Sequence, residues 1–147
     1  AGATHEEALQ AARDILPRLH LYGSLTTLKY LAMGGRIGKF PANMANLFDI
    51  RPVMTMIDGK LGLLEKVRTH RMAMNRLVQL LEKSVKDKES VRAGIVHVNN
   101  LEDAKLLESR LRADLPMPAE ILIAEFTPGL SVHGGTGLVA AVLVTKE

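Results

Sequence analysis

Apolar residues recur every three or four positions in several stretches of the chain, the spacing of an amphipathic helix. The first stretch follows Thr4 and Glu7, which form the T-x-x-E pattern of a capping box, and predicts a helix from about residue 5 to Pro17. Asn100 begins another such stretch, with Asp103 in its first turn. Further helical spacing is found at 25–32, at 43–48, and from a cap at Arg68 or Thr69 to Val85; the stretch after Asn100 runs to Leu115.

Other stretches carry the signals of strands. Asp58-Gly59 separates Val53–Ile57 from Leu61–Val67, and this dipeptide supplies the positive φ angles that a two-residue hairpin turn requires. We therefore expect two antiparallel strands there. Additional strands are expected at 19–23, 95–98, 121–126 and 138–144, with a glycine-rich loop over 127–137 between the last two.

The order of these elements indicates the fold class. Six strands alternate with four or five helices, which predicts an α/β fold with two layers and a mixed sheet of about six strands. The 147 residues suffice for one domain, so we treat 1–147 as a single domain. The chain opens Ala-Gly-Ala-Thr without an initiator Met, a basic segment or an apolar segment, and we expect it to be a fragment of a longer protein.

Composition narrows the function classes. The chain lacks cysteine, which excludes disulfides, thiolate catalysis and Cys-based metal sites, and fits a cytoplasmic protein. Its net charge of +3 and low aromatic content of 3% argue against a nucleic-acid surface. The longest apolar run, Leu138–Val144, is far shorter than the ~20 residues of a membrane-spanning helix, so we expect no membrane span.

The glycine-rich segment Gly34-Gly35-Arg36-Ile37-Gly38-Lys39 is a candidate for anion binding. Backbone N–H groups in such a loop, together with the Arg36 guanidinium, can hold a carboxylate or phosphate. The segment is not a Walker A loop, because Met33 stands where that motif needs glycine and neither Ser nor Thr follows Lys39. A helix C-terminus with solvated basic residues is the alternative interpretation.

Two further polar segments are candidates. Alternation in Glu65–Arg71 places Lys66 and Arg68 on the face opposite Glu65 and Val67, where they could dock an anion or an acidic partner. The alternative is a solvated basic strand end. The other segment, 131–137, holds His133 among closely spaced glycines, which allow a ligand near the backbone. The alternative there is a flexible connection with an incidental histidine.

No pattern in the sequence indicates a catalytic centre. There is no G-x-S-x-G nucleophile elbow, and the carboxylates are scattered over helices rather than paired. No histidine pair has metal-ligand spacing, so we predict neither a metal site nor a cofactor. His97 lies within an apolar strand and is interpreted as a core or sheet-end residue.

Six ordered motifs together closely resemble the C-terminal domain of the DegV family over about residues 5–145. They are Leu28-Lys29-Tyr30-Leu31, Gly34-Gly35-Arg36-Ile37-Gly38, Ile50-Arg51-Pro52-Val53, Asp58-Gly59, Glu65-Lys66-Val67-Arg68-Thr69 and His133-Gly134-Gly135-Thr136-Gly137. The last departs from the family pattern, in which Pro often stands at the position of Thr136.

The resemblance implies a bacterial protein that buries a long-chain fatty acid and presents its carboxylate to a separate fatty acid kinase, without itself being an enzyme. It places Arg36 and His133, with Gly35 and Gly134, around the acyl head group, and Arg68 with Lys66 toward the kinase. The family also has an N-terminal domain that binds the carboxylate, and no part of this chain matches it. On these grounds we expect Arg36, Arg68 and His133 to converge beside an apolar cavity.

Two other functions compete with lipid binding. In one, the chain is an interaction or regulatory domain whose basic loops dock an acidic protein or nucleic acid. In the other, it is an enzyme similar to dihydroxyacetone kinase subunits, an analogy of fold alone. The isolated domain would also form a homodimer if a second copy covers the surface left by the missing domain.

Overall fold

The structure, a computed structural model, describes residues 2–35, 50–86, 88, 90–116 and 120–146. Within these ranges one mixed sheet has the strand order β3-β2-β1-β6-β4-β5. The strands are β1 (Leu19–Ser24), β2 (Arg51–Ile57), β3 (Lys60–Val67), β4 (Ser90–His97), β5 (Leu122–Glu125) and β6 (Val139–Thr145). The helices are α1 (His5–Ile15), α2 (Lys29–Met33), α3 (His70–Ser84), α4 (Leu101–Asp114) and α5 (Pro128–Gly134). The predicted α/β class with a mixed sheet is confirmed.

Strand pairing follows from the connections. β2 and β3 pair antiparallel as a hairpin, and β1 and β6 are antiparallel to each other and to their other neighbours. β4 and β5 are parallel, because α4 carries the chain back to the starting end of the sheet between them. This crossover completes the mixed sheet.

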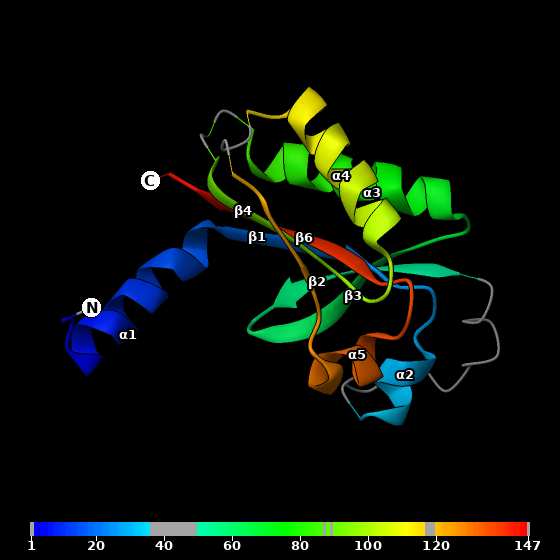
Figure 1. Cartoon of the computed structure of the whole chain (residues 1–147), viewed down its shortest axis with the longest axis horizontal. Helices are drawn as coiled ribbons and strands as arrows, with labels where there is room; N and C mark the ends of the chain where they lie inside the picture. Colours follow the sequence, from blue (N-terminus) through cyan, green and yellow to red (C-terminus); the bar gives the residue numbers. More distant parts are fainter. Residues whose placement is uncertain (1, 36–49, 87, 89, 117–119, 147) are drawn as a thin grey trace.

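The helices divide between the two faces of the sheet (Figure 1). α3 and α4 lie side by side on one face, whereas the short α2 and α5 lie together on the other side of the sheet, near one end. α1 projects from the sheet and buries none of its residues (Figure 1). Among the described residues, no helix other than α2 and α5 therefore lies over this second face.

The main core lies between the sheet and the pair α3 and α4. Leu77 and Leu81 of α3 and Leu107 and Leu111 of α4 are each 0% exposed. They pack against inward side chains of the strands, namely Val53, Ile95, Val139, Ala141 and Leu143. The predicted apolar stripes of both helices are confirmed as this core.

Local signals in the sequence produce the expected caps and turn. The Glu7 N–H donates to Thr4 Oγ1 at 3.2 Å while Glu7 Oε2 accepts from the Thr4 N–H at 2.7 Å, which completes the capping box of α1. Thr69 rather than Arg68 caps α3, accepting from the Met72 N–H at 3.2 Å. Asp58 and Gly59 have φ angles of 48° and 73°, as the hairpin turn requires.

Four expectations about elements need correction or lie outside the description. Part of 127–137, expected as a loop, forms α5, which begins at Pro128 and whose first turn is closed when the Leu130 and Ser131 N–H groups donate to Thr127 O. Its glycines hid the helical spacing. The first helix ends at Ile15 and continues as a 3₁₀ turn over Leu16–Arg18, and β4 begins five residues before the expected strand at 95. The helix expected at 43–48 lies outside the described residues.

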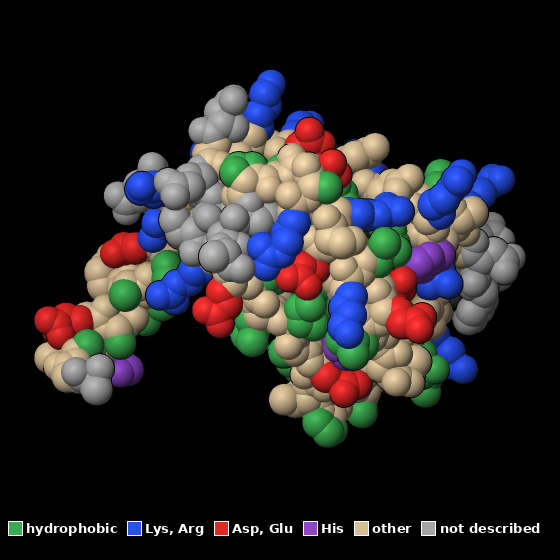
Figure 2. All heavy atoms as spheres, turned by 45° about the horizontal axis from the view of Figure 1, so that its top comes forward, with side chains coloured by type: hydrophobic (Ala, Val, Ile, Leu, Met, Phe, Trp, Pro, Cys, Tyr) green, Lys and Arg blue, Asp and Glu red, His purple; other side chains and the backbone are tan. Residues whose placement is uncertain are grey.

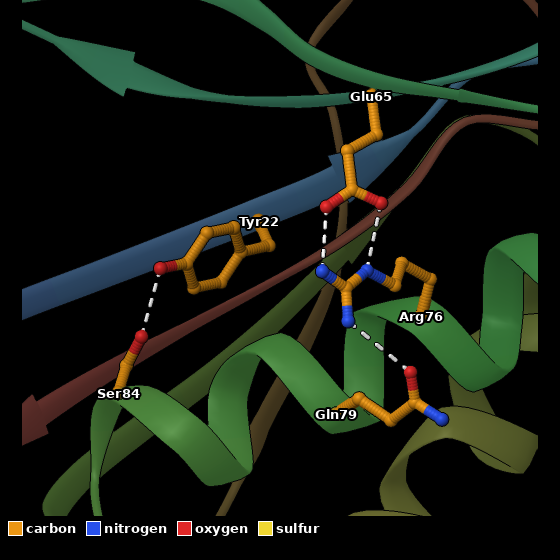
Figure 3. A network of polar contacts seen from close by, with 5 residues as sticks. All are labelled: Tyr22, Glu65, Arg76, Gln79 and Ser84. Carbon is orange, nitrogen blue, oxygen red and sulfur yellow. Dashed lines mark hydrogen bonds and ion pairs between the residues drawn. The ribbon is translucent and has the colours of Figure 1, made fainter.

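A two-pronged ion pair joins the sheet to α3 (Figure 3). Arg76 donates from Nη2 to Glu65 Oε1 at 2.5 Å and from Nε to Oε2 at 2.7 Å. The hydrogen bonds from Arg76 lower the pKa of the Glu65 carboxyl below its ordinary value, against a smaller opposing effect of burial. Glu65 thus lies on the face of the sheet that α3 covers.

Replacing Glu65 by Gln is expected to lower the free energy of unfolding at neutral pH by about 0.5–1 kcal/mol, the range of partly exposed ion pairs. A carboxyl whose pKa is lowered by folding stabilises above its unfolded pKa, and loses that contribution as pH falls through the lower folded value. The difference between parent and E65Q should therefore shrink as pH falls below about 4.5, measured by urea unfolding. Glu82→Gln, an exposed change on α3, the helix that carries Arg76, serves as control. A pH-independent difference would contradict the prediction.

Candidate functional site

An apolar cavity lies on the sheet face opposite α3 and α4. Successive side chains of a strand point to opposite faces, so one residue fixes the direction of its neighbours. Tyr22 of β1 faces α3, where its hydroxyl lies 2.7 Å from Ser84 Oγ (Figure 3). Leu21 and Gly23 therefore face the other side, and both line the cavity.

The cavity has a volume of about 790 Å³, within the range of about 300–1,000 Å³ that ligand sites occupy. Its floor consists of residues from five neighbouring strands, β3, β2, β1, β6 and β4, and α2 and α5 close one end. The lining residues that the strands contribute are Leu21, Gly23, Met54, Met56, Lys60, Leu61, Val96, Ala140 and Val142. The site is thus a predominantly apolar surface of the sheet itself.

A second apolar cluster surrounds the closed end. Leu25, Leu28 and Leu31, from α2 and the turn before it, are at most 3% exposed and pack with Met54 and Leu138. This cluster is separate from the core beneath α3 and α4 and holds α2 against the sheet. This packing therefore fixes the position of the cavity wall to which Leu31 and Gly35 belong.

α2 and α5 approach each other closely because glycines lie between them. A Cβ atom at Gly135 would lie 2.3 Å from the Tyr30 ring, and the residue has a φ of 75°. At Gly134 a Cβ atom would lie 2.5 Å from Leu138 Cδ1. Contacts under 3.0 Å force a neighbour to shift, so a side chain at position 135 would displace the Tyr30 ring and one at position 134 would displace the end of the Leu138 side chain.

The structure brings together three of the four residues expected to bind a ligand. Gly35, His133 and Gly134 all line this one cavity, although Gly35 lies far from the other two in the sequence. Arg36 lies outside the described residues. The role of all four in binding stays a prediction.

Lys66 and Arg68, expected to dock a partner, do not line the cavity. Both side chains are exposed, at the end of β3 and in the turn before α3. Neither takes part in an ion pair within the described part of the chain. Of the expected convergence of Arg36, Arg68 and His133, the described residues thus place only His133 at the cavity.

His97 behaves as interpreted from the sequence. It is 6% exposed at the end of β4, and its Nδ1 accepts from the Asn100 N–H at 3.3 Å. Asn100 uses its side-chain amide to bridge Asp103 and the Gly137 carbonyl, at 2.7 and 3.1 Å. These contacts tie the start of α4 to the loop before β6 and leave His97 in a structural role.

Sequence reasoning missed the residues that form the floor of the cavity. A signal for them was present, because the apolar run of 138–144 is apolar at positions that point to both faces of the sheet. Such a strand needs cover on both sides, and within the described ranges α3 and α4 form a packed helical layer on one of them. Lys60, at the hairpin turn, was missed as well, because nothing in its local sequence relates it to the cavity.

The electrostatic character of the cavity differs from that of the helical face. Its ionisable lining residues, among those described, are Lys60 and His133, so the lining has basic groups and no carboxylate. On the side that carries α3 and α4, Figure 2 shows Lys and Arg interspersed with Asp and Glu. An apolar cavity with basic groups at its margin suits an amphipathic molecule with an anionic head.

The described residues contain neither a metal-binding cluster nor a membrane-spanning helix. No cluster of three or more His, Asp or Glu side chains in those ranges is arranged around a point that a metal ion could occupy. None of the described helices has the length and apolar character needed to cross a membrane.

Comparison with known proteins gives consistent matches. The family pattern described as "Uncharacterised protein, DegV family" matches residues 1–146. A DegV domain-containing protein of Streptomyces coelicolor is 30% identical over 146 residues, which is 99% of this chain and 52% of the relative. A crystal structure of a DegV family protein from Corynebacterium glutamicum has a TM-score of 0.88 at 28% identity, covering 99% of this chain and 55% of its own.

A further crystal structure carries a functional description. It is a fatty-acid-binding DegV family protein from Streptococcus agalactiae, with a TM-score of 0.83 at 26% identity over 99% of this chain and 51% of its own. The chain therefore spans about half the length of the relatives it matches.

Proposed function

The chain belongs to the DegV family, and from that membership we propose that its cavity buries the alkyl tail of a long-chain fatty acid. The observation that carries the proposal is the cavity of about 790 Å³, whose lining is apolar except for basic or neutral polar groups. The fatty-acid-binding relative from Streptococcus agalactiae supports it by its shared fold. The chain acts as a cytoplasmic binder and not as a catalyst.

Tail burial supplies most of the affinity. Each methylene removed from water contributes about 0.8 kcal/mol, so a tail of about 14 methylenes contributes on the order of 11 kcal/mol before the entropic cost of binding. The head group determines orientation. Donors from His133 and Arg36 replace the water lost by the carboxylate, whose burial without hydrogen bonds would cost several kcal/mol.

The finer part of the proposal concerns partners. The half of the relatives that this chain does not span corresponds to an N-terminal domain, which completes the carboxylate site. A separate fatty acid kinase then receives the presented head group. Lys66 and Arg68 support this docking role because both are exposed and belong to no ion pair of the described residues.

Lengthening the acid should raise the affinity steeply. Going from 12 to 16 carbons adds four methylenes, or about 3 kcal/mol, so the Kd should fall by roughly 200-fold. The measurement is displacement of a fluorescent fatty acid from the 147-residue chain by acids of graded length. A Kd that is independent of tail length would contradict the proposal.

The competing function is docking of an acidic partner without lipid, and it predicts a different dependence of binding on salt concentration. Contacts to exposed charges weaken steeply between low and moderate salt, whereas a buried alkyl tail responds little. Binding of hexadecanoic acid that is unchanged from 50 to 200 mM salt would favour lipid uptake. Absence of any acid binding, with salt-sensitive binding of an acidic protein, would favour the alternative.

A further inference from the structure

The ring of His133 lies directly against Gly34, at the contact between α5 and the end of α2. A Cβ atom built at Gly34 would lie 2.2 Å from His133 Nδ1 and 2.7 Å from Cε1. Real Cβ contacts do not fall below 3.0 Å, so any side chain at position 34 would displace the imidazole. The Nδ1–Cε1 edge of the ring can therefore occupy this position only because residue 34 has no Cβ.

The reason for glycine at position 34 is space and not backbone freedom. Gly34 has φ −80° and ψ 0°, a conformation that any L-residue adopts. Its neighbour Gly35 is the reverse case, with φ 64° and no atom of the described residues within 4 Å of a built Cβ. The two adjacent glycines thus have different functions, and only Gly34 determines where the histidine ring lies.

The contact also determines which ring nitrogen carries the proton. His133 Nδ1 is buried and has no hydrogen-bond partner among the described residues. A proton on Nδ1 would be a buried donor without an acceptor, which costs about 1–3 kcal/mol. On this argument a neutral ring would carry its proton on Nε2, the ring nitrogen that is not among the atoms nearest Gly34, and His133 itself lines the cavity.

We propose that Gly34 is a positioning residue that holds His133 as the Nε2–H tautomer, with this donor directed at the anionic head of the ligand. The inference rests on the proposed function for the identity of the ligand, a fatty acid. Gly34 itself need not touch the ligand. It acts through the ring, by allowing the Nδ1–Cε1 edge to pack against the backbone of α2.

A purely structural role for Gly34 would be to let α2 pack on α5, and a double-mutant cycle separates the two. Gly34→Ala and His133→Ala should each raise the Kd for hexadecanoic acid about tenfold, as loss of a hydrogen bond to a charged group does. The double variant should be no weaker than either single one. Losses that multiply in the double variant would overturn the proposal.

The cycle has two matched controls. Gly129→Ala makes the same substitution in α5 at a position where a Cβ meets no atom within 4 Å, and it should leave the Kd unchanged. Hexadecanol shares the tail but lacks the carboxylate, so Gly34→Ala should reduce its affinity much less than that of the acid. An equal loss for acid and alcohol would show that Gly34 affects only the cavity wall, and would overturn the proposal.

A measurement on the unaltered chain needs neither ligand nor variant. Nitrogen-15 NMR of the imidazole distinguishes the two neutral tautomers, and His133 should be observed with its proton on Nε2. A proton on Nδ1 would overturn the positioning proposal even if fatty acids bind. If the Nε2–H form is observed and no acid binds, the tautomer assignment holds, but the proposed function fails and the role of Gly34 toward a ligand fails with it.

Discussion

Replacing Leu107 by Ala is expected to lower the free energy of unfolding by about 3 kcal/mol. Leu107 lies in the middle of α4 and is 0% exposed within the core between the helices and the sheet. Truncation removes its buried methyl and methylene groups and leaves a void that close-packed neighbours fill only in part. Urea unfolding of the 147-residue chain, followed by circular dichroism at 222 nm, measures the change.

The adjacent residue provides a control. Leu106 belongs to the same helix and is 40% exposed, so Leu106→Ala changes helix propensity equally while removing little buried surface. Its cost should stay below about 1 kcal/mol. Similar losses at both positions would show that α4 does not bury Leu107 against the sheet, and would contradict the described core.

Replacing Val142 by Phe is expected to weaken binding of hexadecanoic acid by roughly fifty-fold. Val142 is part of the cavity floor on β6. A phenyl ring there should exclude about three methylenes of the tail, which at about 0.8 kcal/mol each amounts to about 2.4 kcal/mol. Because this side chain points away from the core beneath α3 and α4, the fold should persist, which circular dichroism can verify.

Val144→Phe is the matched control for that experiment. Val144 points to the same face of β6, two residues along, but does not line the cavity. It should leave the Kd of hexadecanoic acid within about threefold of the parent. Val142→Phe should also reduce the affinity for dodecanoic acid less than the affinity for hexadecanoic acid, since fewer methylenes of the shorter acid reach the blocked region. Equal effects of the two substitutions would place the tail elsewhere.

The elements that local chemistry specifies were predicted well. The capping box of Thr4 and Glu7, the Asp58-Gly59 turn and the apolar stripe of α3 depend on residues within a few positions of one another. Such interactions are determined by neighbouring residues and need no knowledge of the rest of the chain. α5 was missed because glycines obscure its apolar spacing and its packing against α2 supplies part of what stabilises it.

The sequence by itself determined the fold class and the apolar stripes of the core helices. It also identified the glycine-bearing segments around positions 35 and 134 as candidates for ligand binding. Only the tertiary structure decided that Gly35, His133 and Gly134 share one cavity, because their proximity results from strand order and from the packing of α2 on α5. The same holds for the floor of the cavity. Residues such as Met54 and Val142 are ordinary apolar strand positions, and they line a cavity because the described part of the chain packs α3 and α4 on the other face of the sheet.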